Sequence, residues 1–124
     1  MAISLSQLNR TNVPKPPRIL IHGVAGVGKT TFAAESRSPV FVQTEDGLGT
    51  LAATSFPLAR TFEEVMGALA ALYTEEHEHG TVVIDSVDWL EPLIWNKACR
   101  DNGWNSIEDP GYGRGYIAAL ALWR

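Results

Sequence analysis

Short apolar runs alternate along the chain with apolar positions at helical spacing. Three runs, at residues 18–22, 40–43 and 81–85, are mainly apolar and contain β-branched side chains, which is typical of strands in a parallel sheet covered on both faces. A fourth short run, at 56–59, predicts an edge strand. Because helical patterns separate these runs, the chain predicts an α/β fold with a mainly parallel sheet.

The clearest helix begins after Thr61, because apolar residues then recur every three or four positions, at Phe62, Val65, Met66, Leu69, Leu72 and Tyr73. Thr61 and Glu64 predict a capping box at its start. Other helices are predicted at 29–36, at 88–101 and from about residue 116 onward. Residues 1–17 are polar and contain prolines, so they predict a flexible N-terminal arm before a domain at 18–124.

A glycine-rich motif directly follows the first predicted strand. Residues 23–30 read Gly-Val-Ala-Gly-Val-Gly-Lys-Thr, the G-x-x-x-x-G-K-[ST] pattern of a phosphate-binding loop, in the strand-and-helix context that the motif requires. Backbone N–H groups and the positive end of the helix suit the phosphates of a nucleoside triphosphate. Gly23, Gly26 and Gly28 are expected to adopt positive φ and to let the backbone approach those phosphates.

The polar side chains of this loop have separate expected tasks. Lys29 places an ammonium against the β- and γ-phosphates, and the Thr30 hydroxyl is placed to bind Mg²⁺. Thr31 is expected near the α-phosphate. With ATP and Mg²⁺ as the expected ligands, the predicted nucleotide-binding residues are Gly23, Val24, Ala25, Gly26, Val27, Gly28, Lys29, Thr30 and Thr31.

Acidic residues lie at or just after the ends of two other predicted strands. Asp85 closes the run 81–85, where a carboxylate can hold Mg²⁺ on the same sheet edge as the loop. Alternatively, Asp85 caps the next helix, for which Asp88 is better placed. Glu45 follows the run 40–43 and is the candidate that orients or deprotonates the attacking water, with Asp46 as the neighbouring alternative. The same loop could instead be a solvated turn.

Composition and charge narrow the classes of function. In this 124-residue chain, 45% of the residues are apolar and 19% are charged, as in ordinary globular domains. A net charge of −4 argues against a broad basic face for nucleic acid, so any such contact must be local or assembled from several subunits. The single cysteine, Cys99, and the lack of an apolar stretch near the roughly 18 residues of a membrane span lead us to expect a cytoplasmic protein with no membrane partner.

Several of these segments together resemble a known family. Residues 83–87, with Leu90 and Pro92, resemble the Walker B segment of RecA-type recombinases, and 41–45 is similar to the strand of that family that ends in the catalytic glutamate. With the phosphate loop and 112–116, the pattern over roughly residues 17–124 most resembles phage-encoded ATP-binding proteins with a RecA-like core. These proteins belong to the AAA-labelled P-loop group, which includes single-strand annealing recombination proteins.

The resemblance implies a three-layer P-loop NTPase fold and Mg²⁺-dependent ATP hydrolysis coupled to single-stranded DNA binding. Lys29 and Glu45 would be the catalytic residues, and Thr30 and Asp85 would hold the metal. A further strand would follow the last helix and lie between the phosphate-loop strand and the Asp85 strand. Since the sequence ends at Arg124, the domain is expected to be truncated before that strand or to complete its sheet with another chain.

The arginine finger of such ATPases would lie beyond the last residue or on a partner subunit, so a homo-oligomer is expected. A phage-encoded protein would act in the host cytoplasm. Within the chain itself, the glycine-rich segment 111–116 offers Arg114 as the best candidate for a contact with DNA or a neighbouring subunit, and the same segment could instead be a simple glycine-rich connection before a helix.

Two other functions stay open. One is a P-loop kinase for a small metabolite or nucleotide, although the chain has no obvious basic lid. The other is a non-catalytic nucleotide-binding assembly module, which the short length favours. Residues 96–99 resemble a guanine-reading N-K-x-D motif but end in Cys99, which cannot accept the hydrogen bonds of the base, so ATP is favoured over GTP.

Overall fold

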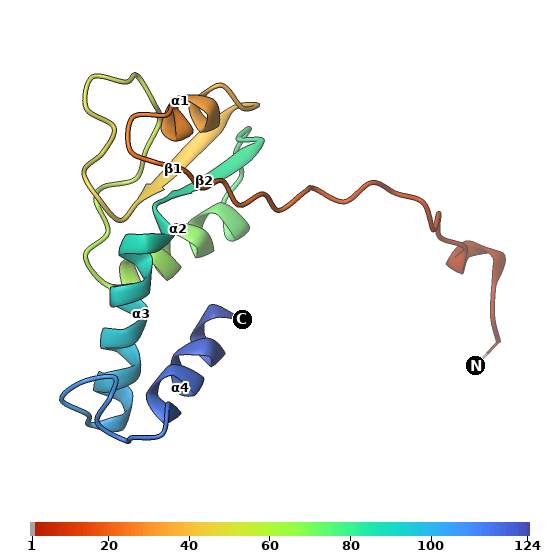
Figure 1. Cartoon of the computed structure of the whole chain (residues 1–124). Helices are drawn as coiled ribbons and strands as arrows, with labels where there is room; N and C mark the ends of the chain where they lie inside the picture. The colour runs from red at the N-terminus through yellow and green to blue at the C-terminus, as the bar shows by residue number, and fades with distance from the viewer. Residues whose placement is uncertain (1) are drawn as a thin grey trace.

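The computed structural model describes residues 2–124, which form two parallel strands, four α-helices and one short 3₁₀ turn (Figure 1). In chain order the elements are η1 (Leu5–Gln7), α1 (Lys29–Ala34), β1 (Pro39–Gln43), α2 (Phe62–Thr74), β2 (Thr81–Asp85), α3 (Val87–Asn102) and α4 (Arg114–Trp123). Helix α1 is shorter than the predicted helix at 29–36. Among these elements, no helix has the length and apolar character needed to cross a membrane.

Strands β1 and β2 pair in parallel, with Phe41 opposite Val83 and Gln43 opposite Asp85. Just past the last of these pairs, the Thr44 N–H donates to the Asp85 carbonyl oxygen at 2.9 Å. The carboxyl ends of the two strands therefore meet at one edge of the sheet. This register brings the loop after β1 beside the end of β2, as the sequence pattern predicts.

The predicted edge strand at 56–59 runs beside β1, but the isolated bridge to β1 joins Phe41 to Ser55, one residue before this run. The N–H groups of Phe56 and Ala59 donate to the carbonyl oxygens of Phe41 and Gln43 at 3.0 and 2.9 Å. The two donors are three residues apart, whereas their acceptors in β1 are two apart, so an extra residue interrupts the ladder. The segment thus lies at the edge of the sheet beside β1, but it is not the regular strand that the sequence predicts.

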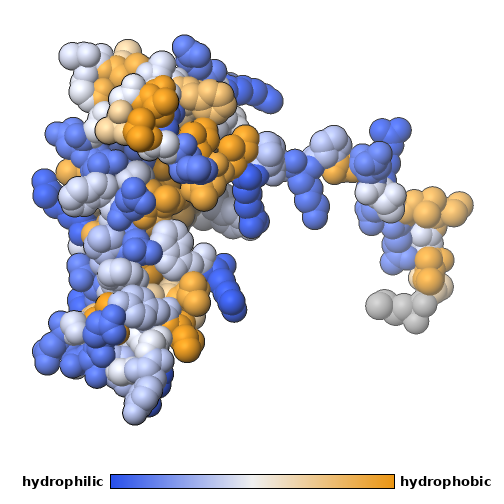
Figure 2. Space-filling view, in the orientation of Figure 1, coloured by the Kyte–Doolittle hydropathy of each residue, from blue (hydrophilic) through white to orange (hydrophobic). Residues whose placement is uncertain are grey.

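The first predicted strand, at 18–22, is absent from the structure. Ile19 and Leu20 are 71% and 73% exposed, and Val82 in β2, predicted to be buried, is 48% exposed. Figure 2 shows this apolar surface beside the strand pair. A parallel strand is stable only where neighbouring strands satisfy its N–H and C=O groups, and no segment of residues 2–124 forms a ladder with 18–22. The described sheet therefore has two strands, fewer than the RecA-like sheet that the resemblance implies.

The core is one cluster of buried apolar residues from β1, residue 59 and the helices α2, α3 and α4. Its members are Val42, Ala59, Val65, Ala68, Leu90, Ile94, Ala98 and Ala119. Phe41, next to Val42 in β1, is also fully buried, so both faces of this strand are covered. Trp95 of α3 meets Tyr116 of α4 edge to face, with ring centroids 5.5 Å apart. These contacts fix the end of β1 and the start of α3, on which the candidate site depends.

Helix α2 begins as the sequence predicts, with Thr61 as its N-cap. The Thr61 hydroxyl accepts a hydrogen bond from the Glu64 N–H at 3.2 Å. The predicted capping box is only half formed, because the Glu64 carboxylate accepts from the Arg60 N–H and not from Thr61. Helices α3 and α4 begin at Val87 and Arg114, each slightly before the predicted start.

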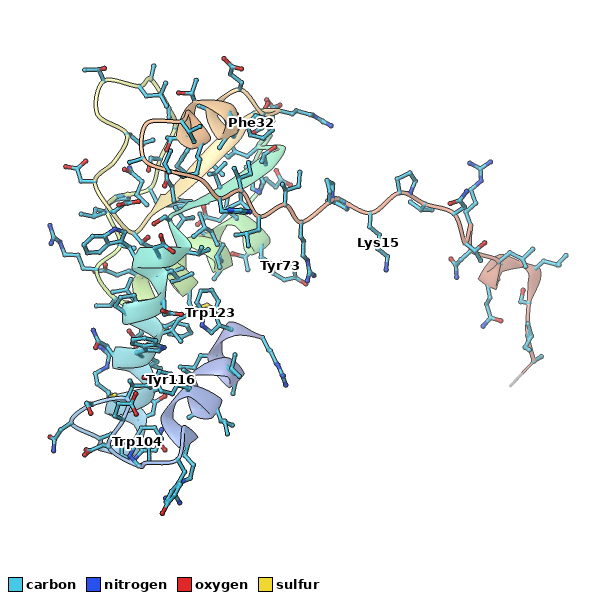
Figure 3. All side chains as sticks on the ribbon, in the orientation of Figure 1. Lys15, Phe32, Tyr73, Trp104, Tyr116 and Trp123 are labelled. Carbon is cyan, nitrogen blue, oxygen red and sulfur yellow. The ribbon has the colours of Figure 1, made fainter. Side chains whose placement is uncertain are left out.

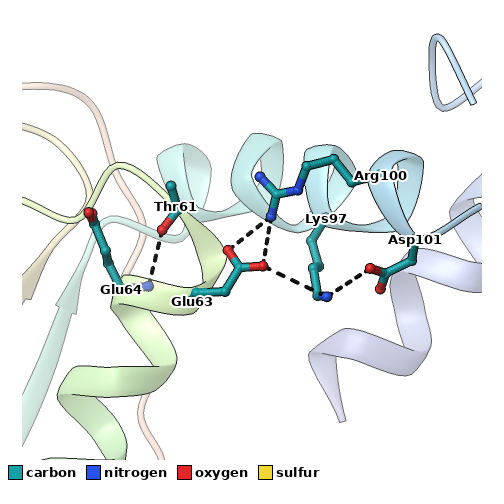
Figure 4. Close-up of polar contacts among 6 residues, drawn as sticks. All are labelled: Thr61, Glu63, Glu64, Lys97, Arg100 and Asp101. Carbon is teal, nitrogen blue, oxygen red and sulfur yellow. Dashed lines mark hydrogen bonds and ion pairs between the residues drawn. The ribbon is translucent and has the colours of Figure 1, made fainter. Parts of the chain in front are cut away.

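Ion pairs join α2 to α3 on the surface (Figure 4). The Arg100 guanidinium donates to both oxygens of Glu63 at 2.8 and 2.9 Å. Lys97 Nζ lies 3.7 Å from the Glu63 carboxylate and 2.7 Å from that of Asp101. The pKa of Glu63 is lowered chiefly by a backbone hydrogen bond. Desolvation opposes this shift, and the hydrogen bond and charge of Arg100 and the charge of Lys97 lower the pKa further. Because these groups face solvent, the pairs stabilise the packing of the two helices only modestly.

Residues 2–17 extend away from the rest of the chain and are exposed (Figure 1). The short turn η1 within them is not predicted by the sequence analysis. It is closed by Ser4, whose hydroxyl accepts from the Ser6 N–H and whose own N–H donates to the Gln7 side chain. Residue 1, which belongs to the predicted arm, lies outside the described residues. The described arm adds no buried residue to the core, and its flexibility stays a prediction.

Candidate functional site

The phosphate-loop motif forms a turn that opens into α1. The Val27 N–H donates to the Val24 carbonyl at 3.4 Å, and the Phe32 N–H donates to the Gly28 carbonyl at 2.9 Å as the helix begins. Gly26 and Gly28 have φ of 78° and 104°. Side chains rarely adopt this left-handed region, so the turn requires glycine at both positions. The positive φ expected at these two glycines is present.

Gly23 does not adopt a positive φ, so the prediction for this glycine is wrong. A Cβ at this position would lie 3.2 Å from Val27 Cγ1, which is a tight contact across the turn. Gly23 therefore serves the close packing of the loop and not a left-handed backbone.

The ammonium group of Lys29 is turned back onto its own loop. Its Nζ donates to the carbonyl oxygens of Gly23 at 2.6 Å and Val24 at 2.9 Å. These bonds use two of the three ammonium donors and tie the start of the loop to the start of α1. Phosphate oxygens are charged acceptors and form stronger hydrogen bonds than neutral carbonyls, so they could replace these partners.

The structure brings together Thr30 at the start of α1 and Asp85 at the end of β2. Thr30 Oγ1 donates to Asp85 Oδ2 at 2.9 Å, and both side chains are partly buried. A hydrogen bond to a carboxylate is stronger than one between neutral groups. The bond joins two segments far apart in the sequence and places a hydroxyl oxygen beside a carboxylate oxygen.

Glu45 lies directly after the end of β1 and is partly buried. Its side chain lies near Gly47, where a Cβ would be 3.8 Å from Glu45 Cγ. Asp46, the neighbouring alternative, is exposed and one residue further from the strand. The sheet register thus brings the backbones of Glu45 and Asp85 to one edge, whereas the direct side-chain contact in the site is the one between Thr30 and Asp85.

Thr44 is a residue of this region that the sequence analysis missed. It is the one buried polar residue in the described part of the chain, with 8% of its surface exposed. Its Oγ1 donates to the Ser86 carbonyl at 2.6 Å and accepts from the Ser86 N–H at 2.9 Å. A threonine after a strand carries no distinctive pattern, and its position directly before Glu45 is the signal that could have identified it.

The other predicted nucleotide-binding residues lie on the open surface of the loop, namely Val24, Ala25, Val27 and Thr31, all exposed. Phe32, one residue beyond and labelled in Figure 3, is 63% exposed as well. An apolar hollow of about 380 Å³ lies between α2 and residues 56–59, and no residue of the phosphate loop lines it. The candidate site is therefore an open surface built from the loop, Thr30 and Asp85.

A second exposed group lies at the start of α4, at the opposite end of the molecule from α1 (Figure 1). The ring of Tyr112 is 97% exposed, and the guanidinium carbon of Arg114 lies 5.7 Å from its centroid, which is a cation–π contact. Arg114 also donates to the Pro110 carbonyl at 2.7 Å. These bonds hold a cation and an aromatic ring together on the surface.

Comparison with known proteins agrees with the motif. A family model described as an AAA domain matches residues 15–124, which is most of the chain. No curated protein and no solved structure matches the chain. The matched residues include the phosphate loop, Glu45, Asp85 and Arg114.

Proposed function

The chain belongs to the AAA-domain family of P-loop nucleotide-binding proteins, and on this premise we propose that it binds ATP with Mg²⁺ and hydrolyses it. The observation that carries the proposal is the 2.9 Å hydrogen bond from the Thr30 hydroxyl to the Asp85 carboxylate. It connects the last residue of the phosphate-loop motif with the carboxylate at the end of β2. A site for a metal-bound triphosphate needs both groups at one place.

The donor chemistry of this pair fits Mg²⁺. This ion prefers oxygen ligands and is commonly held by one or two protein oxygens together with substrate phosphates and water. Thr30 and Asp85 offer a hydroxyl and a carboxylate oxygen. Residues 2–124 contain no cluster of three or more His, Cys, Asp or Glu side chains that could hold a metal, and a site of this kind does not require one. When bound, Mg²⁺ would offset the negative charge on the β- and γ-phosphates.

The residues of the chain bind the triphosphate and orient the water. Lys29 exchanges the carbonyl oxygens of Gly23 and Val24 for phosphate oxygens and offsets their charge. Gly26 and Gly28 leave open space where a Cβ would stand, so the backbone can lie close to the ligand. Glu45 orients the attacking water and accepts its proton.

Single-stranded DNA is the proposed partner to which hydrolysis is coupled. With a net charge of −4, the chain requires a local contact and not a broad basic face. Tyr112 and Arg114 support such a contact, since an exposed ring can stack on a base and the guanidinium can contact phosphate. We expect Arg114→Ala to reduce the stimulation of hydrolysis by DNA. Annealing recombination in the host cytoplasm of a phage is the proposed setting, and it rests on the sequence resemblance alone.

Self-association is part of the proposal. Helix α4 leaves Ile117, Leu120 and Trp123 at 66%, 52% and 40% exposure, and Figure 3 labels Trp123 at its end. Exposed apolar side chains grouped on one helix are typical of surfaces that bind another protein. Light scattering with and without ATP measures the assembly size, and a monomer under both conditions would remove this part of the proposal.

The deciding experiment measures ATP hydrolysis with and without single-stranded DNA for the wild type, Glu45→Gln and Asp46→Asn. We expect Glu45→Gln to lose turnover while it still binds ATP, and Asp46→Asn, the matched control, to behave as the wild type. Equal loss in both variants would contradict the role of Glu45. Saturable ATP binding without turnover would indicate a nucleotide-binding assembly module, and transfer of phosphate to an added small acceptor would indicate a kinase.

A further inference from the structure

Thr44 joins the ends of β1 and β2 at the candidate site. Its N–H donates to the Asp85 carbonyl at 2.9 Å. Its hydroxyl donates to the Ser86 carbonyl at 2.6 Å and accepts from the Ser86 N–H at 2.9 Å. The buried Thr44 hydroxyl thus donates one hydrogen bond to Ser86 and accepts another from it. Together these two bonds fix both the position and the orientation of Ser86.

This junction reaches the candidate site through both strand ends. On the β2 side, Asp85 is held by the Thr44 backbone and accepts the Thr30 hydroxyl bond at 2.9 Å. On the β1 side, Glu45 is the next residue along the chain. A shift between Thr44 and Ser86 would therefore change the distance between the carboxylate proposed to hold the metal and the one proposed to orient water.

We propose that Thr44 is a positioning residue, whose hydroxyl sets the placement of the Asp85 and Glu45 carboxylates relative to each other. The inference rests on the proposed function of the same site. The proposed role affects turnover and not the binding of the triphosphate by the loop, because the phosphate loop and Lys29 form no hydrogen bond with Thr44. Misplacement of catalytic groups by about 1 Å can lower a rate on the order of 100-fold, so a hydroxyl at this junction can control kcat without touching the nucleotide.

The variants separate positioning from simple structural support. Thr44→Val keeps the shape of the side chain and removes the hydroxyl, and Thr44→Ala is a second hydroxyl-free variant should valine disturb the fold. Thr44→Ser keeps the hydroxyl but loses a buried methyl group, so it is expected to lose stability without losing turnover. The matched control is Ser55→Ala, because the Ser55 hydroxyl accepts from Gln43 Nε2 at 2.7 Å and donates to Phe56 at 2.8 Å without contacting β2.

The measurements are kcat per folded molecule and the affinity for ATP in EDTA, with the folded fraction taken from urea unfolding of each variant. We expect the hydroxyl-free variants to lower kcat about 10- to 100-fold, with the affinity for ATP in EDTA within about twofold of the wild type and Thr44→Ser close to the wild type. The proposal is overturned if these variants lose no more kcat than Ser55→Ala, if the affinity for ATP in EDTA falls as kcat falls, or if Thr44→Ser fails to keep the activity.

A second measurement keeps this inference distinct from hydrolysis itself. Titration calorimetry gives the gain in ATP affinity that Mg²⁺ produces over EDTA. If the wild type binds ATP but does not turn it over, the proposed hydrolysis fails. The positioning role then holds only if the gain in ATP affinity from Mg²⁺ is about tenfold smaller in the hydroxyl-free variants than in the wild type, because a misplaced Asp85 holds the metal less well. It is overturned if this gain is unchanged. A wild type that binds no ATP would overturn both proposals.

Discussion

Substitution of glycine by alanine is expected to change the stability of the fold in opposite directions at two helical positions. Gly115 is the second residue of α4 and is buried, and an added Cβ would lie 1.9 Å from the Ile107 carbonyl oxygen and 2.9 Å from the Ile107 carbonyl carbon. Gly67 lies inside α2 and is exposed, and an added Cβ would meet no atom within 4 Å. We therefore predict that Gly115→Ala destabilises the fold and that Gly67→Ala stabilises it.

The magnitudes follow from these contacts. At Gly115 the obstacle is backbone, so the loop before α4 or the helix itself must move by about 1.5 Å to reach ordinary contact at 3.4 Å. Overpacking of a well-packed site costs about 1–3 kcal/mol, and the better helix propensity of alanine offsets only part of it. At Gly67 only the propensity changes, which adds about 0.5–1 kcal/mol of stability.

Urea unfolding followed by far-ultraviolet circular dichroism measures both variants beside the wild type. The expected difference between their free energies of unfolding is about 1–4 kcal/mol, with Gly115→Ala the less stable. Gly115→Ala with a free energy of unfolding equal to that of the wild type would show that α4 does not pack closely on the preceding loop. Destabilisation by Gly67→Ala would contradict the open space observed at that position.

Other substitutions test the core, the surface ion pairs and the candidate site. Ile94→Ala is expected to cost about 2–5 kcal/mol in urea unfolding, because Ile94 is 2% exposed in the core, and a loss below 1 kcal/mol would contradict that packing. The pKa of Glu63 is lower in the folded chain than its ordinary value of 4.5, so Glu63 contributes stability at pH values above 4.5. This contribution is lost as the pH falls through the lower pKa of the folded state. We expect Arg100→Ala to raise that pKa toward 4.5 in a carboxyl titration followed by nuclear magnetic resonance, and an unchanged pKa would show that Arg100 has no part in it. Thr30→Val removes the hydroxyl bonded to Asp85, so it should abolish most of the gain in ATP affinity from Mg²⁺, whereas a full gain would refute the metal assignment.

The helices and strands that depend on a local pattern of apolar residues can be predicted from the sequence. β1, β2, α2 and α3 lie within a few residues of their predicted positions, because apolar periodicity and the residues at their ends determine them. The approach of Thr30 to Asp85 also follows, since a helix that opens from the phosphate loop and the end of a parallel strand share one edge of the sheet.

Features that depend on distant partners do not follow from the sequence. Residues 18–22 have a strand-like composition, but a strand forms only beside a neighbour that completes its hydrogen bonds. The role of Thr44 depends on Ser86, which lies 42 residues away, and no spacing rule points to that pair. Gly23 belongs to the motif, yet its need for glycine comes from the Val27 side chain and not from φ, which only the folded loop reveals.

The central claim is that the loop from Gly23 to Thr31 binds the triphosphate of ATP through Lys29. Isothermal titration calorimetry of folded protein with ATP and Mg²⁺ tests it most directly, with Lys29→Ala as the comparison and circular dichroism to confirm that both are folded. The account predicts saturable binding to the wild type and a loss of affinity in Lys29→Ala with the fold intact, since among residues 2–124 the Lys29 ammonium donates to the loop and not to the core. No binding to the folded wild type, or equal affinity in the variant, would contradict it.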